Sequence, residues 1–194
     1  MSKELPVVRQ ANAYDAASIA RLIHRSHTIS FAPFASEEWV GSRDIEEYRS
    51  KWQSVFDTAG DNEVTYVATL DDTVVGSVRV AQLQSSEFDA QLVGMHVEPG
   101  LTGRGIGSLL MNRAKVFIEE QGFSRVELGV IAANTGTRRF YETHGWLLVR
   151  ELVDGVEGVP VVIYELGPGR YAALAARRAE HSASKQRALD DTES

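Results

Sequence analysis

The apolar residues of the first sixty positions recur mostly at helical spacing. A short β-prone run spans residues 5–9, and a helical pattern begins directly after Asp15. One side of that helix is formed by Ile19, Leu22 and Ile23. Pro33 favours a loop over residues 28–36. The chain therefore opens with a strand, a helix and a loop.

A second amphipathic segment covers residues 37–56. Ser36 precedes two glutamates, and this arrangement predicts a helix start with acidic groups at the positive end of the helix dipole. The spacing of the aromatic and aliphatic residues suits one long helix or two helices broken near Gly41.

After Gly60 the pattern changes to short β-rich runs that alternate with helical segments. The expected strands cover residues 64–70, 74–83, 91–97, 126–131, 146–152 and 159–166, and the expected helices cover 106–121 and 134–143. Gly122 is the expected C-terminal stop of the first of these helices. This order favours an α+β fold, a largely antiparallel twisted sheet with helices on both faces.

Composition narrows the class of protein. The 194 residues are 43% hydrophobic and contain no cysteine, which suits one globular domain without disulfides, thiolate metal sites or a cysteine nucleophile. We expect the domain to cover residues 1–167 and the Ala- and Arg-rich segment 168–194 to be a helical or disordered tail.

Charge and hydropathy predict where the protein works. The formal net charge of −7 argues against nucleic acid or an anionic membrane as a partner. The sequence has neither an apolar stretch long enough to span a bilayer nor an N-terminal signal core. We therefore expect a cytoplasmic protein.

The most informative segment is a glycine-rich turn between a strand and a helix, Glu98-Pro-Gly-Leu-Thr-Gly-Arg-Gly-Ile-Gly107. Glycine permits positive φ and close approach of a ligand to the backbone. A helix N-terminus presents unpaired N–H groups and a partial positive charge. Together these features predict a phosphate or pyrophosphate cradle.

Two other phosphate-binding motifs fit the turn poorly. The turn has no lysine, so it is not the P-loop of a nucleotide triphosphatase. The dinucleotide fingerprint GxGxxG fails at Ser108, and about a hundred residues precede a turn that should lie in an early βαβ unit.

The turn resembles the acetyl-CoA loop of the GNAT family of N-acetyltransferases, in which Arg or Gln is followed by x-x-G-x-G. Thr102 stands at the first position of this loop, a departure that leaves the backbone contacts of the motif intact. The preceding strand resembles the one that hydrogen-bonds the pantetheine arm. Downstream, the segment 134–146 resembles the family pattern N-x(5)-FYE-x-x-GF.

The resemblance implies a set of site residues. Those expected to bind acetyl-CoA are Met95, His96, Val97, Gly103, Arg104, Gly105, Ile106, Gly107, Ser108, Asn134 and Tyr141. Tyr141 falls where the family often places the acid that protonates the departing thiolate, and His96 is the second catalytic candidate. The implied reaction is direct acetyl transfer from the thioester to a primary amine, with no metal.

The identity of the base that deprotonates the amine stays open. At the positions where some family members carry an acid, this chain has Gly129 and Gln91. The remaining candidates are His96, Glu98, Glu127 and an ordered water. His24 and His27 suggest a solvated or substrate-cleft pair rather than a metal site, since no further ligand is suitably spaced.

The acceptor is expected to be an amine of a small molecule or of a protein, and a homodimer is a family-level expectation. The expected pocket walls are Phe31, Phe34, Trp39, Trp52 and residues 154–158. The alternative function is a non-catalytic acyl-CoA-binding module on the same fold.

Overall fold

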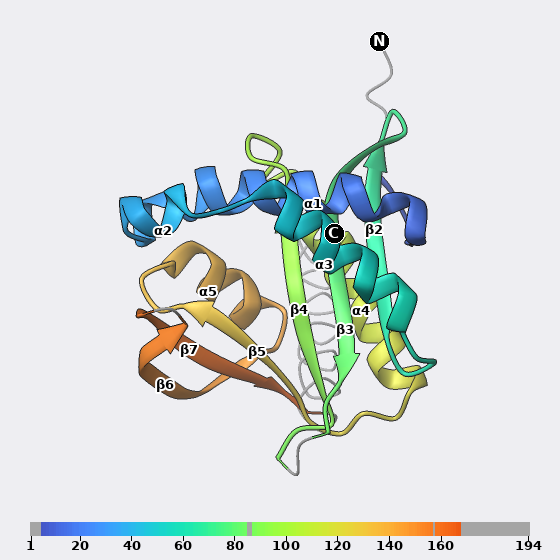
Figure 1. Cartoon of the computed structure of the whole chain (residues 1–194). Coiled ribbons are helices and arrows are strands. Elements are labelled where there is room, and N and C mark those ends of the chain that lie inside the picture. The colour runs from blue at the N-terminus through green and yellow to red at the C-terminus, as the bar shows by residue number, and fades with distance from the viewer. Residues whose placement is uncertain (1–4, 85–86, 157, 168–194) are drawn as a thin grey trace, which may run out of the picture.

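The computed structural model describes residues 5–84, 87–156 and 158–167 (Figure 1). The strands are β1 (Val7–Gln10), β2 (Val64–Leu70), β3 (Thr73–Gln82), β4 (Ala90–Val97), β5 (Val126–Ile131), β6 (Leu147–Val156) and β7 (Val159–Leu166). The α-helices are α1 (Ala16–Arg25), α2 (Glu37–Gly41), α3 (Ile45–Thr58), α4 (Ile106–Glu120) and α5 (Thr135–Thr143). The segment 168–194, predicted to be a tail, lies outside the described residues.

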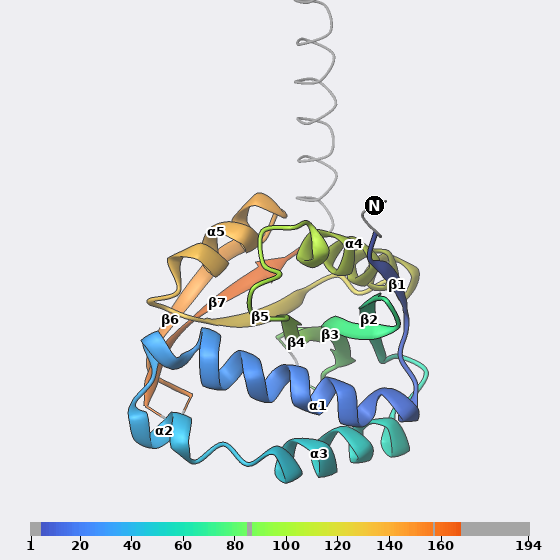
Figure 2. The same ribbon diagram turned by 90° about the horizontal axis from the view of Figure 1, so that it is seen from above.

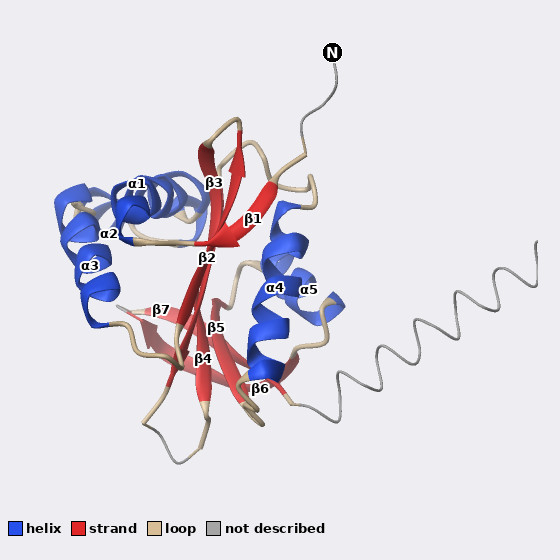
Figure 3. Ribbon diagram, turned by 90° about the vertical axis from the view of Figure 1, so that its right-hand side faces the viewer, coloured by secondary structure: helices blue, strands red, loops and turns tan. Residues whose placement is uncertain are grey.

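In the part of the chain that the structure describes, the strands form one seven-stranded sheet in the order β1-β2-β3-β4-β5-β7-β6. Every pairing is antiparallel except that of β4 with β5, which is parallel. Helices α1 to α3 lie on one face of the sheet, and α4 and α5 lie on the other (Figures 2 and 3). The predicted α+β class, with a largely antiparallel sheet and helices on both faces, is confirmed.

Two apolar clusters hold the layers together. Helix α4 buries Leu110, Met111 and Ala114 against the sheet. On the opposite face, Ile19 and Ile23 of α1 pack with Trp52 of α3. The predicted apolar side of the first helix is therefore its buried side, and burial of this stripe fixes α1 to the sheet.

The loop predicted over residues 28–36 is helical for much of its length. Helix α1 continues into a wide π-type turn at Ser26–Ser30, and a 3-10 turn follows at Ala32–Phe34. Pro33 lies in the first turn of that short helix, where its missing N–H group removes no hydrogen bond. The continued helix extends the α1 backbone to the edge of the site described below.

The segment 37–56 forms two helices, the second of the two predicted alternatives. The Ser36 hydroxyl accepts a hydrogen bond from the Trp39 amide at 3.1 Å and caps α2, as predicted. Helix α2 ends at Gly41, and the Asp44 carboxylate caps α3 by accepting from the Glu46 amide at 2.9 Å. The Asp44 cap, which was not predicted, starts the new helix.

Candidate functional site

Strands β4 and β5 separate soon after they meet (Figure 1). They are paired only at Ala90–Val126 and Gln91–Glu127. On its other edge β5 pairs with β7 along its whole length, while one edge of β4 over residues 92–97 has no strand partner among the described residues. Gly94 has a φ of +60° where the register between β3 and β4 shifts, so a bulge bends β4 at the opening. The sheet is thus split at its centre.

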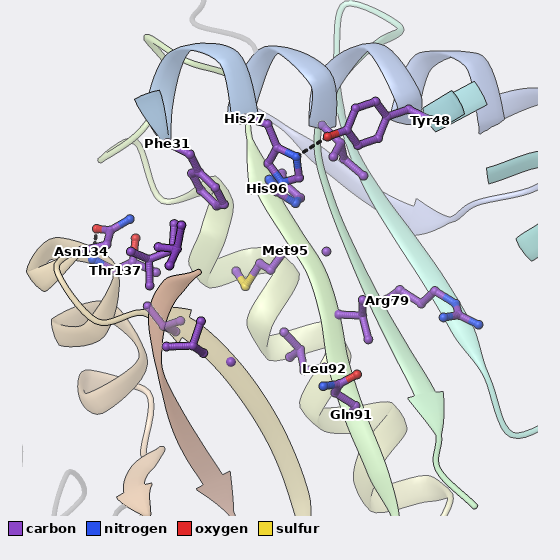
Figure 4. Close-up of a pocket in the computed structure, with 18 of the residues that line it drawn as sticks. His27, Phe31, Tyr48, Arg79, Gln91, Leu92, Met95, His96, Asn134 and Thr137 are labelled. Atoms are coloured by element: carbon purple, nitrogen blue, oxygen red, sulfur yellow. Dashed lines mark hydrogen bonds between the residues drawn. The ribbon is translucent and has the colours of Figure 1, made fainter. Parts of the chain in front are cut away.

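A cavity of about 440 Å³ occupies this split. Its walls come from both faces of the sheet, as Figure 4 shows for the side chains around β4. The face that carries α1 to α3 contributes His27, Phe31, Trp39, Tyr48, Lys51 and Trp52, and the β5–α5 side contributes Ile131, Asn134, Thr137 and Tyr141. The size suits a small ligand, and the cavity can join reactants that approach from opposite faces.

The glycine-rich turn leads into α4 with an open backbone. Gly103 and Gly105 have φ values of +75° and +85°, and a side chain on either would meet no atom within 4 Å. Gly105 is the N-cap of α4 and supplies no side-chain cap, so the first N–H groups of the helix gain no partner from it. These features suit an anion that binds through backbone amides.

The other predicted residues of this turn have different surroundings. The Ile106 side chain is buried, so only its backbone can face a ligand there, and Arg104 is exposed. The Ser108 hydroxyl lies 3.1 Å from Nε2 of His144. A Cβ atom added at Gly107 would lie 3.4 Å from the Phe140 ring, in van der Waals contact across the α4–α5 interface.

Asn134 and Tyr141 lie at the two ends of α5 and both line the cavity. The Asn134 side-chain oxygen accepts from the Thr137 amide at 3.1 Å and caps the helix. This use of the oxygen leaves the Asn134 amide nitrogen without a hydrogen-bond partner among the described residues. It is therefore a donor that a ligand in the split can use.

The Tyr141 ring is packed among aromatic neighbours. Its centroid lies 5.4 Å from that of Phe140 and 6.1 Å from that of Trp146. The residue is 6% exposed, and burial raises the pKa of the Tyr141 phenol. The hydroxyl therefore stays protonated and can act as a hydrogen-bond donor.

His96 is buried beneath the end of α1. Its Nδ1 lies 2.8 Å from the Ser26 hydroxyl, and its ring packs edge-on against His27 with centroids 5.2 Å apart. Burial, and then the neighbouring His27, lower the pKa of His96 to about 3. The imidazole is neutral at physiological pH, and its Ser26 contact fixes the orientation of the ring.

His27, expected with His24 to be solvated or to lie in a substrate cleft, is a titratable side chain at the site. It lines the cavity, and its Nδ1 lies 2.6 Å from the Tyr48 hydroxyl (Figure 4). Phe31 and Trp39 flank the ring at centroid distances of 4.9 and 5.5 Å. The only sequence signal for the location of His27 at the cavity was the expected substrate-cleft position of the His24–His27 pair.

The two glutamates considered as bases do not line the cavity. Glu98 forms an ion pair with Arg25 at 2.7 Å. Glu127 lies where β4 and β5 still pair, and desolvation raises its pKa. Neither carboxylate is therefore placed at the opening of the sheet.

The expected pocket walls are placed only in part around the cavity. Phe31, Trp39 and Trp52 line it, whereas Phe34 does not. Val159, just beyond the expected 154–158 segment, lines the β7 side of the cavity.

Arg138 of α5 donates to the Tyr164 hydroxyl at 3.2 Å and to the Ala132 carbonyl at 3.1 Å, so it connects α5 to β7.

Comparison with known proteins identifies the class that this fold and site define. The model of the acetyltransferase (GNAT) family matches residues 28–146, more than half of the chain. The chain therefore belongs to the GNAT acetyltransferase family. Among curated proteins, no sequence matches it.

Solved structures share the fold at low sequence identity. PaiA N-acetyltransferase of Thermoplasma acidophilum, in complex with coenzyme A, is 20% identical, with a TM-score of 0.71 over 84% of this chain and 99% of that one. YncA of Salmonella typhimurium, with its cofactor acetyl-CoA, is 15% identical, with a TM-score of 0.66 over 84% and 94%. The ribosomal-protein-S18-alanine N-acetyltransferase of Escherichia coli is also 15% identical, with a TM-score of 0.64 over 84% and 94%.

Within the described ranges, every helix is too short or too polar to cross a bilayer.

Proposed function

We propose that this protein is an acetyl-CoA-dependent N-acetyltransferase that moves an acetyl group directly from the thioester to a primary amine. The observation that carries the proposal is the cavity through the split sheet, because it is lined from both faces. Coenzyme A or acetyl-CoA is bound in two structures that share the fold, those of PaiA and YncA. Family membership supports the acetyl group, and the arrangement of donors and bases below supports the amine.

The residues present fit coenzyme A. The open amides around Gly103 and Gly105 suit the diphosphate, and the unpaired edge of β4 suits the amide groups of the pantetheine arm. The Asn134 amide nitrogen adds a donor on the α5 side. When bound, acetyl-CoA supplies an activated acyl group and a thiolate leaving group.

The amine must lose a proton before or during attack, because a protonated amine has no lone pair. We assign His27 as the proton acceptor, directly or through one water. It lines the cavity on the α1–α3 face, whereas Glu98 and Glu127 do not. The Tyr48 contact at 2.6 Å fixes the orientation of the His27 ring.

The oxyanion formed on attack needs hydrogen-bond donors. The unpaired edge of β4 near Met95 and Val97 offers backbone N–H groups, and the bulge at Gly94 aims this edge into the cavity. His96 keeps its ring neutral beside His27 and holds β4 to the end of α1 through Ser26. Its proposed role is to position the strand and the base.

Departure of the thiolate needs little help from a general acid, since a thiol has a pKa of about 8.5. Because burial raises the pKa of Tyr141, its hydroxyl keeps its proton and stabilises the thiolate by donating a hydrogen bond. The thiolate then takes its proton from solvent or from protonated His27. The amide product and free coenzyme A leave from opposite faces of the sheet.

Release of coenzyme A thiol with a library of primary amines tests the proposal. We expect acetyl-CoA-dependent thiol release, formation of the N-acetyl product by mass spectrometry, and micromolar binding of acetyl-CoA by calorimetry. Tight binding of acetyl-CoA without thiol release for any amine would instead favour the alternative function, a non-catalytic acyl-CoA-binding module.

A further inference from the structure

The wall of the cavity on the α1–α3 face has an unusual charge. We call it the acceptor wall, and it is formed by His27, Phe31, Trp39, Tyr48, Lys51 and Trp52. Among all described lining residues of the cavity, the permanently charged side chains are Lys51 and Arg79, and there is no carboxylate. This contrasts with the formal net charge of −7 of the chain.

The two cations differ in their availability. Arg79 donates to Glu63 at 2.5 Å, so its charge is largely compensated. Lys51 is exposed at the cavity and has no ion-pair partner within the described ranges. Lys51 is therefore the cation that an acceptor molecule can engage.

A second observation points to a ligand that accepts hydrogen bonds. The indole Nε1 of Trp39 is buried and has no hydrogen-bond partner among the described residues. A buried N–H group without a partner is unfavourable, so a ligand atom that reaches it and accepts its hydrogen bond would be stabilised. With Lys51, this wall offers donors and no anionic acceptor.

The spacing of the wall suits a compact molecule. Lys51 follows Tyr48 by three residues on α3, and the Tyr48 hydroxyl contacts His27. Side chains three apart on a helix have Cβ atoms about 5–6 Å from each other. Lys51 thus lies next to the residue that contacts the base, so one small molecule can meet both side chains with two different groups.

We propose that the acceptor is a small amine that also carries a carboxylate, an amino acid or a similar compound with an apolar or aromatic body. This inference rests on the proposed function. The amine faces His27, the carboxylate pairs with Lys51, and the aromatic side chains of the wall cover the body. A polyamine finds no carboxylate there to balance its remaining positive charges.

Amines that differ only in the carboxylate, together with a polyamine, test the preference for an acceptor that carries a carboxylate. The probes are L-phenylalanine and L-leucine, their decarboxylated counterparts phenethylamine and isoamylamine, and spermidine. After correction for the fraction of neutral amine, we expect kcat/KM to be at least tenfold higher for each amino acid than for its counterpart. Equal or higher kcat/KM for phenethylamine or spermidine would overturn the inference while leaving the proposed function intact.

Substitutions of Lys51 test whether this side chain causes the preference for an acceptor with a carboxylate. In Lys51→Met, the preference for L-phenylalanine over phenethylamine should fall at least fivefold, mainly through KM, and Lys51→Arg should restore it. The control is Arg49→Gln, because Arg49 is exposed on the same helix, pairs with Glu46 and does not line the cavity. An unchanged preference in Lys51→Met would also overturn the inference.

Binding measurements distinguish a failure of the proposed acceptor class from a failure of the proposed function. If no amine releases thiol, the proposed function fails, and the acceptor is tested by calorimetry on the coenzyme-A-loaded protein. L-phenylalanine should then bind at least tenfold more tightly than phenethylamine. Equal affinities would contradict the carboxylate site.

Discussion

The Nδ1 atom of His27 lies 2.6 Å from the Tyr48 hydroxyl and joins the π-type turn after α1 to α3. The contact holds an imidazole at the cavity with Phe31 against its ring at a centroid distance of 4.9 Å. A base must keep a fixed geometry toward the atom it deprotonates. Under the proposed function this pair would supply the base, because no carboxylate lines the cavity among the described residues.

Replacement of His27 by Asn should lower kcat by about a hundredfold or more, the usual contribution of general base catalysis. Acetyl-CoA affinity should stay within about twofold, and Tyr48→Phe should lower kcat by a smaller factor. The matched control is His24→Asn, since His24 lies one turn earlier, contacts the Arg43 carbonyl at 3.3 Å and does not line the cavity. Stopped-flow thiol release measures these rates; equal losses in the His24 and His27 variants would remove His27 as the base.

Tyr141→Phe should lower kcat by about tenfold with little change in acetyl-CoA affinity, because the thiolate leaves readily even without help. The Tyr141 hydroxyl has no hydrogen-bond partner among the described residues, so its loss should leave the free energy of unfolding nearly unchanged. Single-turnover rates and thermal unfolding measure the two effects.

Tyr164→Phe is the structural counterpart of that variant. The Tyr164 hydroxyl donates to Glu142 at 2.7 Å and accepts from Arg138 at 3.2 Å, and the residue does not line the cavity. We expect a loss of about 1–3 kcal/mol in stability with turnover retained. Unchanged turnover in Tyr141→Phe would exclude that phenol as the donor to sulfur.

Gly105→Val should weaken acetyl-CoA binding by at least thirtyfold, because the side chain would project into the open space where we place the diphosphate. A β-branched residue at a φ of +85° also strains the backbone. Gly122→Val controls for this strain, since Gly122 has a φ of +68° in open space just beyond the other end of α4. Calorimetry should show weakened binding only in the Gly105 variant, and a similar change in both would refute the cradle.

His96 makes stability depend on pH. The pKa of His96 in the folded protein, about 3, lies below the ordinary value of 6.5. Between pH 6.5 and pH 3, His96 is therefore protonated in the unfolded chain but neutral in the folded protein. The contribution of His96 to stability is therefore full above pH 6.5 and is lost as pH falls toward 3. Between pH 7 and pH 5 this one group should lower the free energy of unfolding by about 2 kcal/mol.

Urea unfolding of wild type and His96→Gln at both pH values measures that contribution as a difference. Other titrating groups act on both proteins, so the wild type should lose about 2 kcal/mol more than the variant. Parallel stability profiles would show that His96 titrates normally in the folded protein.

Most of the fold could be predicted from local patterns. The hairpin is one example, because the strands expected over 64–70 and 74–83 form β2 and β3, joined by Asp71 and Asp72 with φ values of +48° and +58°. Gly122 is another, since it ends α4 with a φ of +68°. Here the turn residue, the cap and the apolar period all agree.

The continuation of α1 into residues 26–30 could not be predicted in this way. Pro33 suggested a loop, but its position inside a 3-10 turn left the preceding residues free to stay helical. Their conformation is favoured by tertiary contacts, such as Ser26 with His96, seventy residues away. The placement of His27 in the site depends on this long-range packing, so its spacing from His24 carried little information.

The separation of β4 and β5 has a similar origin. Both strands were predicted, but a sequence pattern does not state which residues of two parallel strands remain paired. Pairing stops after Gln91 and Glu127 because β5 follows β7 while β4 follows β3. The cavity arises from this divergence rather than from any motif.

A crystal structure of the protein with acetyl-CoA tests the central claim, delivery of the acetyl group through the split sheet. The account predicts the diphosphate on the backbone amides around Gly105, and the thioester in the cavity with its sulfur within hydrogen-bond distance of the Tyr141 hydroxyl. A coenzyme bound elsewhere, or a thioester that points away from the face carrying His27, would contradict it.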